Sequence, residues 1–150
     1  MKHRFYFWFI ALAILFLDQA VKYLVQSILF PLKSVTIIKG FLSISYVRNF
    51  GAAFGMFPGQ RIMLLIVSIV VCAVVLYFHS KMRHDDGLLH SSMALIFGGS
   101  MGNLIDRIFR PYVIDYIDFR FWPAFNIADM AVNIGIFIII CEMIIRRECS

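Results

Sequence analysis

Four apolar stretches, each long enough to cross a lipid bilayer, constrain this chain more than any other feature. They occupy residues 5–29, 62–78, 88–105 and 127–145, and a membrane-spanning helix needs roughly 20 predominantly apolar residues. The composition agrees, because 61% of the residues are hydrophobic and only 15% are charged, against about half and about a quarter in soluble domains. No span is left over for a soluble unit, so we expect residues 1–150 to form a single four-span membrane domain.

The first apolar stretch follows basic residues, as it would in a cleavable signal peptide. Asp18 and Lys22 lie where a small-residue cleavage site would be required, so we predict an uncleaved first span. Four spans put both termini and the loop around Lys81 on one side of the membrane. The segments on that side are short and dense in Lys and Arg. Because the positive-inside rule acts most strongly on short segments, we predict that both termini are cytoplasmic.

Polar side chains in three of the spans converge at one depth, near the outer surface in this orientation. They are Asp18 and Lys22 in the first span, Asn103 and Asp106 in the third, and Asn126 and Asp129 in the fourth. Gly99 and Gly102 share the face of Asn103, and small residues are typical of close helix packing in membranes. Ionisable groups inside a membrane are costly and usually mark a functional site.

Several of these residues also have a purely structural interpretation. Asp18 and Lys22 are four residues apart on one helical face and can neutralise each other. Asn126 could simply cap the fourth helix. Asp129 has no cation within one turn of its own helix, so it needs a partner from elsewhere in the chain.

The segment before the fourth span supplies two candidate partners. The sequence "VIDYIDF", expected to lie in an outer loop, contains Asp115 and Asp118. Two close carboxyl groups can share a proton, and one then acts as a general base while the other donates to a carbonyl oxygen. The same groups could hold a divalent metal, or Asp129 could relay protons in a transporter. Spacing alone decides neither among these chemistries nor between Asp115 and Asp118.

Five motifs occur along the chain in one specific order. They are "LDQAVK", "YVRNFGAAFG", "GGSMGNLIDR", "VIDYIDF" and "FNIAD". Together they resemble the lipoprotein signal peptidases (signal peptidase II), which are bacterial aspartic membrane proteases. The resemblance implies an endopeptidase of the inner or cytoplasmic membrane that cleaves signal peptides from prolipoproteins just before the diacylglyceryl-modified cysteine. It also implies an active site near the outer face, contact with membrane lipids, and binding of cyclic peptide inhibitors of the globomycin type.

Carried over residue by residue, the resemblance assigns catalysis to Asp115 of "VIDYIDF" and Asp129 of "FNIAD", whereas the family motif does not require Asp118. Asn49 and Arg107 are expected to grip the substrate backbone, since neither has an obvious structural partner in the sequence. The resemblance also assigns a supporting role to a set of mostly polar positions, which in this sequence are Asp18, Lys22, Asn49, Gly99, Asn103, Asp106, Arg107 and Asn126.

The family also carries a small extracytoplasmic β-sheet. Residues 35–54 are rich in β-branched and aromatic residues and fit such a sheet. The expected fold class is therefore an all-α membrane protein with four transmembrane helices and a small extracytoplasmic β-sheet and loop.

Two other functional classes fit the sequence less well. A proton-coupled transporter would need a polar path to the cytoplasmic face, yet the inner halves of the first, second and fourth spans are nearly all apolar. A metal-dependent hydrolase would need a denser set of ligands, and no histidine lies near the outer face. His79, His84 and His90 surround a short cytoplasmic loop and are expected to be solvated. We therefore expect no metal site, no cofactor and no nucleic-acid partner.

Overall fold

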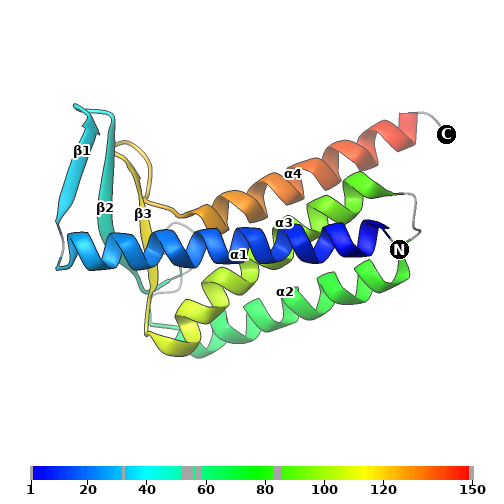
Figure 1. Cartoon of the computed structure of the whole chain (residues 1–150), viewed down its shortest axis with the longest axis horizontal. Helices are drawn as coiled ribbons and strands as arrows, with labels where there is room; N and C mark the ends of the chain where they lie inside the picture. The colour runs from blue at the N-terminus through cyan, green and yellow to red at the C-terminus, as the bar shows by residue number, and fades with distance from the viewer. Residues whose placement is uncertain (1, 32, 52–55, 57–58, 83–85, 149–150) are drawn as a thin grey trace.

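Four long helices form a bundle with a three-stranded sheet at one end (Figure 1). The structure, a computed structural model, describes residues 2–31, 33–51, 56, 59–82 and 86–148. The elements in chain order are α1 (Lys2–Leu29), β1 (Ser34–Ile38), β2 (Leu42–Asn49), α2 (Arg61–Lys81), α3 (Gly87–Phe109), β3 (Val113–Phe119) and α4 (Ile127–Glu148). All four helices are long and apolar enough to cross a membrane. The predicted fold class is therefore confirmed.

The helix α3 forms the centre of the bundle and packs against α1, α2 and α4. Half of its most apolar window is buried inside the protein, against 17% to 28% in the other three helices. Glycines allow the close packing, because a Cβ atom on Gly98 would lie 2.6 Å from the Ala11 carbonyl oxygen. On α4, a Cβ atom on Gly135 would lie 2.6 Å from the Ser92 carbonyl oxygen. The outward faces of the helices are apolar and exposed, as expected of helices in contact with lipid.

The sheet is antiparallel, with the strand order β1-β2-β3. Residues 113–119, which we expected to lie in a loop, form β3 instead. Their alternation explains this, since Ile114 and Tyr116 are buried against Val25 and Leu29 of α1, and strand side chains point alternately to opposite faces. The acidic residues in this segment, which disfavour strands in general, obscured the signal.

A β-bulge in β2 decides which side chains of this strand share a face with Asp115. Ile44 pairs with Ile117 and Val47 pairs with Asp115, so β2 has one more residue than β3 between these pairs. An extra residue shifts the alternation of the strand beyond it. Asn49 therefore lies on the same face as Asp115, whereas Ser45, before the bulge, lies on the face of Asp118 and hydrogen-bonds it at 3.1 Å.

The two termini lie at the end of the bundle opposite the sheet (Figure 1). At that end His79 and His90 are buried rather than solvated as we expected, with their Nδ1 atoms 3.0 Å apart. The reason is that the first turns of α1 cover them, and the Phe7 ring stacks on the His79 ring at 3.8 Å between centroids. His84 lies outside the described residues.

Candidate active site

A cavity of about 720 Å³ opens between α2, α3, α4 and the sheet. Asp115 from β3 and Asp129 from the first turn of α4 both line it. Apolar residues of α2 and α4, together with residues 122–125, form much of the remaining wall. The polar side chains in the wall are Asn49, Ser68, Ser100, Asn103, Arg107, Asp115, Asp129 and Asn133.

Asp115 is almost completely buried, with 2% of its surface exposed. The Asn49 amide donates to its Oδ2 at 2.9 Å, and the Asn126 amide donates to its Oδ1 at 2.7 Å. Burial raises the pKa of Asp115 to about 7, and the negative charge of Asp129 acts in the same direction. The two amide donors and the charge of Lys22 lower that pKa but do not offset the burial. At neutral pH this carboxyl group can therefore hold or release a proton.

Asp129 is fixed by the way in which α4 begins. Asn126 is the N-cap residue, and its Oδ1 accepts from the Asp129 N–H at 2.9 Å. Asp129 Oδ2 accepts in return from the Asn126 N–H at 3.2 Å, which completes a reciprocal capping box. The Asn103 amide donates to the other carboxylate oxygen, Oδ1, at 2.7 Å.

Side chains also satisfy the two remaining N–H groups of this helix start. The Ile127 N–H donates to the Tyr116 hydroxyl at 3.1 Å, and the Ala128 N–H donates to Asp18 Oδ1 at 3.1 Å. The first four N–H groups of a helix have no partner within the helix itself. Here all four have a side-chain acceptor, so the backbone of the helix turn that carries Asp129 is held in place.

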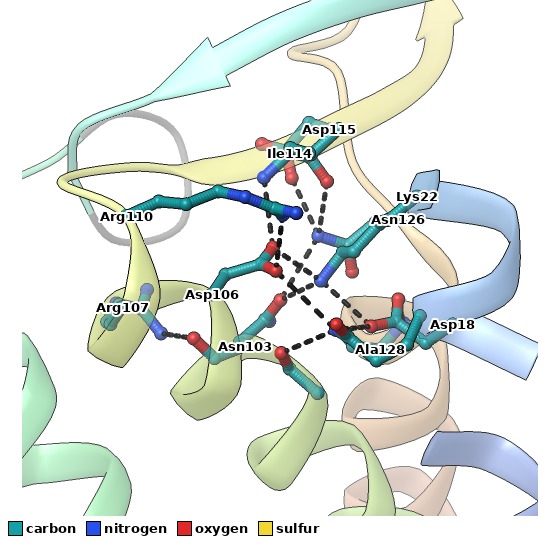
Figure 2. A network of polar contacts seen from close by, with 12 residues as sticks. Asp18, Lys22, Asn103, Asp106, Arg107, Arg110, Ile114, Asp115, Asn126 and Ala128 are labelled. Carbon is teal, nitrogen blue, oxygen red and sulfur yellow. Dashed lines mark hydrogen bonds and ion pairs between the residues drawn. The ribbon is translucent and has the colours of Figure 1, made fainter. Parts of the chain in front are cut away.

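A network of buried charges lies behind the cavity, between α1 and α3 (Figure 2). Lys22 Nζ contacts Asp18 Oδ2 at 2.8 Å and Asp106 Oδ2 at 3.0 Å, and it donates to Asn103 Oδ1 at 3.0 Å. A lysine can only donate, so it holds the Asn103 oxygen towards itself and leaves the amide nitrogen to face Asp129. The Asp106 carboxylate also accepts a hydrogen bond from the Ile114 N–H at 3.1 Å and contacts Arg110 Nη1 at 3.0 Å. The bond to Ile114 connects β3 to the end of α3.

Two glycines of α3 make room for this arrangement. A Cβ atom on Gly102 would lie 2.5 Å from Asp18 Oδ2. A Cβ atom on Gly99 would collide with the Ala128 carbonyl oxygen and would lie 2.9 Å from Val132 Cγ2. Gly99 therefore sets how closely the first turn of α4, which carries Asp129, approaches α3.

Arg107 reaches the cavity from the last turn of α3. Among the residues that the structure describes, its guanidinium makes only long contacts, to Ser68 Oγ at 3.4 Å and to the carbonyl oxygens of Asn103 and Gly51 at 3.5 Å. Arg61 fixes the backbone beneath it by donating to the Arg107 carbonyl oxygen at 2.8 Å. The guanidinium is thus positioned at the cavity and retains donors for another molecule.

The residues predicted from the sequence fall into two groups in the structure. Those that line the cavity are Asn49, Asn103, Arg107, Asp115 and Asp129, and those behind it are Asp18, Lys22, Gly99, Asp106 and Asn126. Asn49 has clear structural partners, contrary to our expectation, because its Oδ1 also accepts the Gly51 N–H at 2.9 Å. Asp118 does not line the cavity.

Sequence reasoning missed two contributors to the site. Tyr116 supports the start of α4 through its hydroxyl, and burial raises the pKa of this phenol. The segment 122–125, which we treated only as loop, lines the cavity. A strand assignment for "VIDYIDF" would have predicted that Tyr116 shares the buried face of Ile114, opposite Asp115.

Two carboxyl groups in one cavity, one of them with a pKa near neutrality, can divide the roles of general acid and general base. Within the described part of the chain, no three His, Cys, Asp or Glu side chains gather closely enough to hold a metal ion.

Comparisons with known proteins agree with this geometry. The sequence profile of the family described as signal peptidase (SPase) II matches residues 10–145. The lipoprotein signal peptidase of Halothermothrix orenii is 45% identical over 126 residues, covering 84% of this chain and 86% of that protein. That of Caldanaerobacter subterraneus is 41% identical over 134 residues, covering 89% of this chain and 92% of the relative.

Solved structures are also similar to this fold. A bacterial membrane enzyme determined by the in meso method at 2.3 Å resolution superposes with a TM-score of 0.87 and 32% sequence identity. The match covers 92% of this chain and 87% of that one. A second such enzyme, at 1.9 Å resolution, gives a TM-score of 0.82 with 33% identity, covering 91% of each chain.

Proposed function

The chain belongs to the signal peptidase II family, whose members are aspartic proteases that remove signal peptides from prolipoproteins, and on this premise we propose that Asp115 and Asp129 are its catalytic pair. The observation that carries the proposal is that Asn126 links the two carboxyl groups. Its side-chain amide donates to Asp115 at 2.7 Å, and its backbone N–H donates to Asp129 at 3.2 Å. Both carboxyl groups also line the same cavity.

We assign the protonated role to Asp115 and the ionised role to Asp129. Burial raises the pKa of Asp115 to about 7, so this group can carry a proton at neutral pH. Asp129 receives two hydrogen-bond donors and lies at a helix N-terminus, where the helix dipole favours a negative charge. Asp129 then takes a proton from the attacking water, while Asp115 donates to the oxygen of the scissile carbonyl. General acid–base help of this kind contributes roughly 100- to 10,000-fold in rate.

Asn49 and Arg107 are proposed to hold the substrate near the scissile bond. Both line the same cavity as Asp115 and Asp129. The long contacts of the Arg107 guanidinium leave donors for a peptide carbonyl oxygen. The other polar residues behind the cavity, including Lys22 and Asp106, support the pair through Asn103 and β3.

The membrane orientation that we propose puts both termini in the cytoplasm and the sheet with the catalytic pair at the outer face. In support, the termini lie together at the end opposite the sheet (Figure 1). The segments at that end are short and carry the exposed cations Arg4, Lys81, Arg146 and Arg147, and the positive-inside rule acts most strongly on short segments. In this orientation the site meets a secreted prolipoprotein at the membrane surface, in contact with lipid. Globomycin-type cyclic peptides are proposed to occupy the same cavity.

The proposal is tested by incubating the purified protein with a lipidated prolipoprotein and detecting signal-peptide loss by gel shift. Asp115→Asn and Asp129→Asn should each abolish cleavage, and the double variant should lose no more than either single one, as for groups that act as a unit. Asp118→Asn is the matched control, because it removes a carboxylate from the same strand outside the cavity. Loss of cleavage in Asp118→Asn with retained cleavage in Asp115→Asn would refute the assignment.

A further inference from the structure

The cavity extends about one helical turn beyond the catalytic pair, away from the sheet, and Ser100 and Asn133 line this deeper part. Ser100 is three residues before Asn103 on α3, and Asn133 is four residues after Asp129 on α4. The two helices run in opposite directions (Figure 1), so both offsets point the same way. At 1.5 Å per residue they correspond to roughly 4.5 and 6 Å. The two polar side chains therefore lie at about the same depth.

Neither side chain has a hydrogen-bond partner within the described part of the chain. Other serines in the spanning helices behave differently. Ser68, Ser91 and Ser92 each donate to the carbonyl oxygen four residues earlier, at 2.9, 2.9 and 2.8 Å. The Ser100 hydroxyl makes no such bond to its own helix and is left for a molecule in the cavity.

Asn133 is exposed at a depth where its surroundings are apolar, with Val67 and Val71 of α2 and Ile134 of α4 lining the same part of the cavity. A side-chain amide can donate two hydrogen bonds and accept two. Polar groups without partners are costly inside a membrane, where water is scarce. Such a residue on a cavity wall indicates a polar ligand group at this position.

We propose that Asn133 and Ser100 bind the substrate backbone on the signal-peptide side of the scissile bond and hold it extended. This inference rests on the proposed catalytic pair and on the signal peptide remaining in the membrane. In a helix the carbonyl oxygens are engaged by the helix itself, so the residues near the cut must unwind to expose the scissile carbonyl. The N–H and C=O groups freed by unwinding then need partners at membrane depth, and Asn133 and Ser100 supply both donors and acceptors.

The spacing predicts which substrate residue is bound. An extended chain advances about 3.3 Å per residue, and Asn133 lies roughly 6 Å from the level of Asp129 along the helix. Asn133 therefore binds the backbone about two residues before the scissile bond. Because the contact is with the backbone, it fits signal peptides of different sequence.

The first arm of the test uses matched variants of the enzyme, in detergent, with a lipidated prolipoprotein. Asn133→Leu should lower kcat/KM by about tenfold, the loss expected for one hydrogen bond, and Ser100→Ala should lower it less. Ser91→Ala, outside the cavity, is the control and should stay within about twofold. The Tm of Asn133→Leu should be unchanged or raised, because an unpartnered amide is removed, whereas a merely structural role would lower it.

The second arm changes the substrate. A synthetic lipidated substrate has the peptide N–H two residues before the scissile bond replaced by an ester oxygen. The wild-type enzyme should cleave it about tenfold more slowly than the amide substrate, while Asn133→Leu should discriminate by less than about twofold. The inference would be overturned, with the proposed function unaffected, by either of two results. One is a wild-type kcat/KM in Asn133→Leu, and the other is an ester substrate that this variant still cleaves about tenfold more slowly than the amide substrate. A wild-type protein that cleaved no lipidated substrate would overturn the proposed function and the inference with it.

Discussion

The Asn126 N–H donates to Asp129 Oδ2 at 3.2 Å, and the Asp129 N–H donates back to Asn126 Oδ1 at 2.9 Å. This reciprocal bond fixes the first turn of α4, and the Asn126 amide nitrogen at the same time donates to Asp115 at 2.7 Å. One side chain therefore has two separable tasks. It caps a helix that carries one carboxyl group, and it contacts the other carboxyl group directly.

Substitutions at Asn126 should separate the two tasks. Asn126→Ala removes both and should destabilise the protein by at least about 1 kcal/mol, the typical value of an N-cap. Asn126→Ser retains a good capping oxygen, so it should recover part of the Tm, but it cannot donate to Asp115 in the same way and should stay poorly active. Thermal unfolding and cleavage rates measured on both variants check this. Equal activity in Asn126→Ser and the wild type would show that the contact with Asp115 is dispensable.

The pH dependence of cleavage should report the ionisation of Asp115. Its pKa is raised to about 7, mainly by burial, and our mechanism needs its protonated form. The value of kcat/KM should therefore fall as the pH rises through about 7, by up to tenfold per pH unit. A rate that increased steadily across this range would contradict the assignment of Asp115 as the proton donor.

Asn49→Ala should move the fall of kcat/KM on the alkaline side, the alkaline limb of the pH profile, to higher pH. The Asn49 amide donates to Asp115 at 2.9 Å and lowers its pKa, because a donor stabilises the ionised form. Without it the pKa rises, so the protonated form persists to higher pH. Ser45→Ala is the control, since Ser45 bonds Asp118 on the opposite face of the sheet and should leave the limb in place.

The four helices and the need of Asp129 for a polar partner could be predicted from the sequence for physical reasons. The apolar stretches are long enough to leave no alternative to membrane-spanning helices, and Asp129 in an apolar helix required a polar partner. The partner itself could not be chosen between Asp115 and Asp118 from spacing. In the structure the two residues, three apart on β3, point to opposite faces of the sheet, and of the two only Asp115 lines the cavity with Asp129.

Other features depend on contacts that the local sequence does not reveal. The bulge in β2 that turns Asn49 towards Asp115 follows from pairing with β3, and Asn49 and Asp115 are 66 residues apart in the chain. Tyr116 caps α4 from the neighbouring strand. His79 and His90 are each followed by a serine in the sequence, yet helix packing with α1 buries them. Each outcome results from tertiary packing of segments that are distant in the chain.

Removal of the buried cation should affect both stability and activity. Lys22 is 1% exposed and contacts Asp18 and Asp106, and removing one partner of a buried ion pair typically costs about 3–5 kcal/mol. Lys22→Met should therefore lower the Tm strongly, and it should also free the Asn103 amide to rotate away from Asp129. Lys33→Met is the control, because Lys33 is exposed. Wild-type stability in Lys22→Met would refute a supporting role for this network.

Gly99→Ala should displace the start of α4. The added Cβ atom would collide with the Ala128 carbonyl oxygen, next to Asp129, and a displacement of about 1 Å at a catalytic group can cost on the order of 100-fold in rate. Gly98→Ala is the matched control, since its Cβ atom would press on Ala11 of α1 instead, at 2.6 Å from the carbonyl oxygen. Both variants should lose stability, but kcat should fall much further in Gly99→Ala. Equal kcat values in the two variants would contradict the positioning role of Gly99.

Cleavage should depend strongly on the diacylglyceryl group of the substrate. In the proposed orientation the catalytic pair lies near the outer surface of the bilayer, so two acyl chains can remain in the membrane while the scissile bond reaches Asp115 and Asp129. Each buried methylene contributes roughly 0.8 kcal/mol to membrane affinity, which holds the bond at a fixed depth. The apolar signal peptide anchors the unmodified substrate too, but it can slide along its axis, and small errors in position reduce the rate steeply.

The same prolipoprotein, compared before and after diacylglyceryl transfer in one batch of liposomes, should be cleaved at least about 100-fold faster in the lipidated form. A substrate with a single acyl chain should give an intermediate rate. Equal turnover of the lipidated and unmodified forms would refute anchoring at a fixed depth, because the signal peptide alone would then suffice to position the scissile bond.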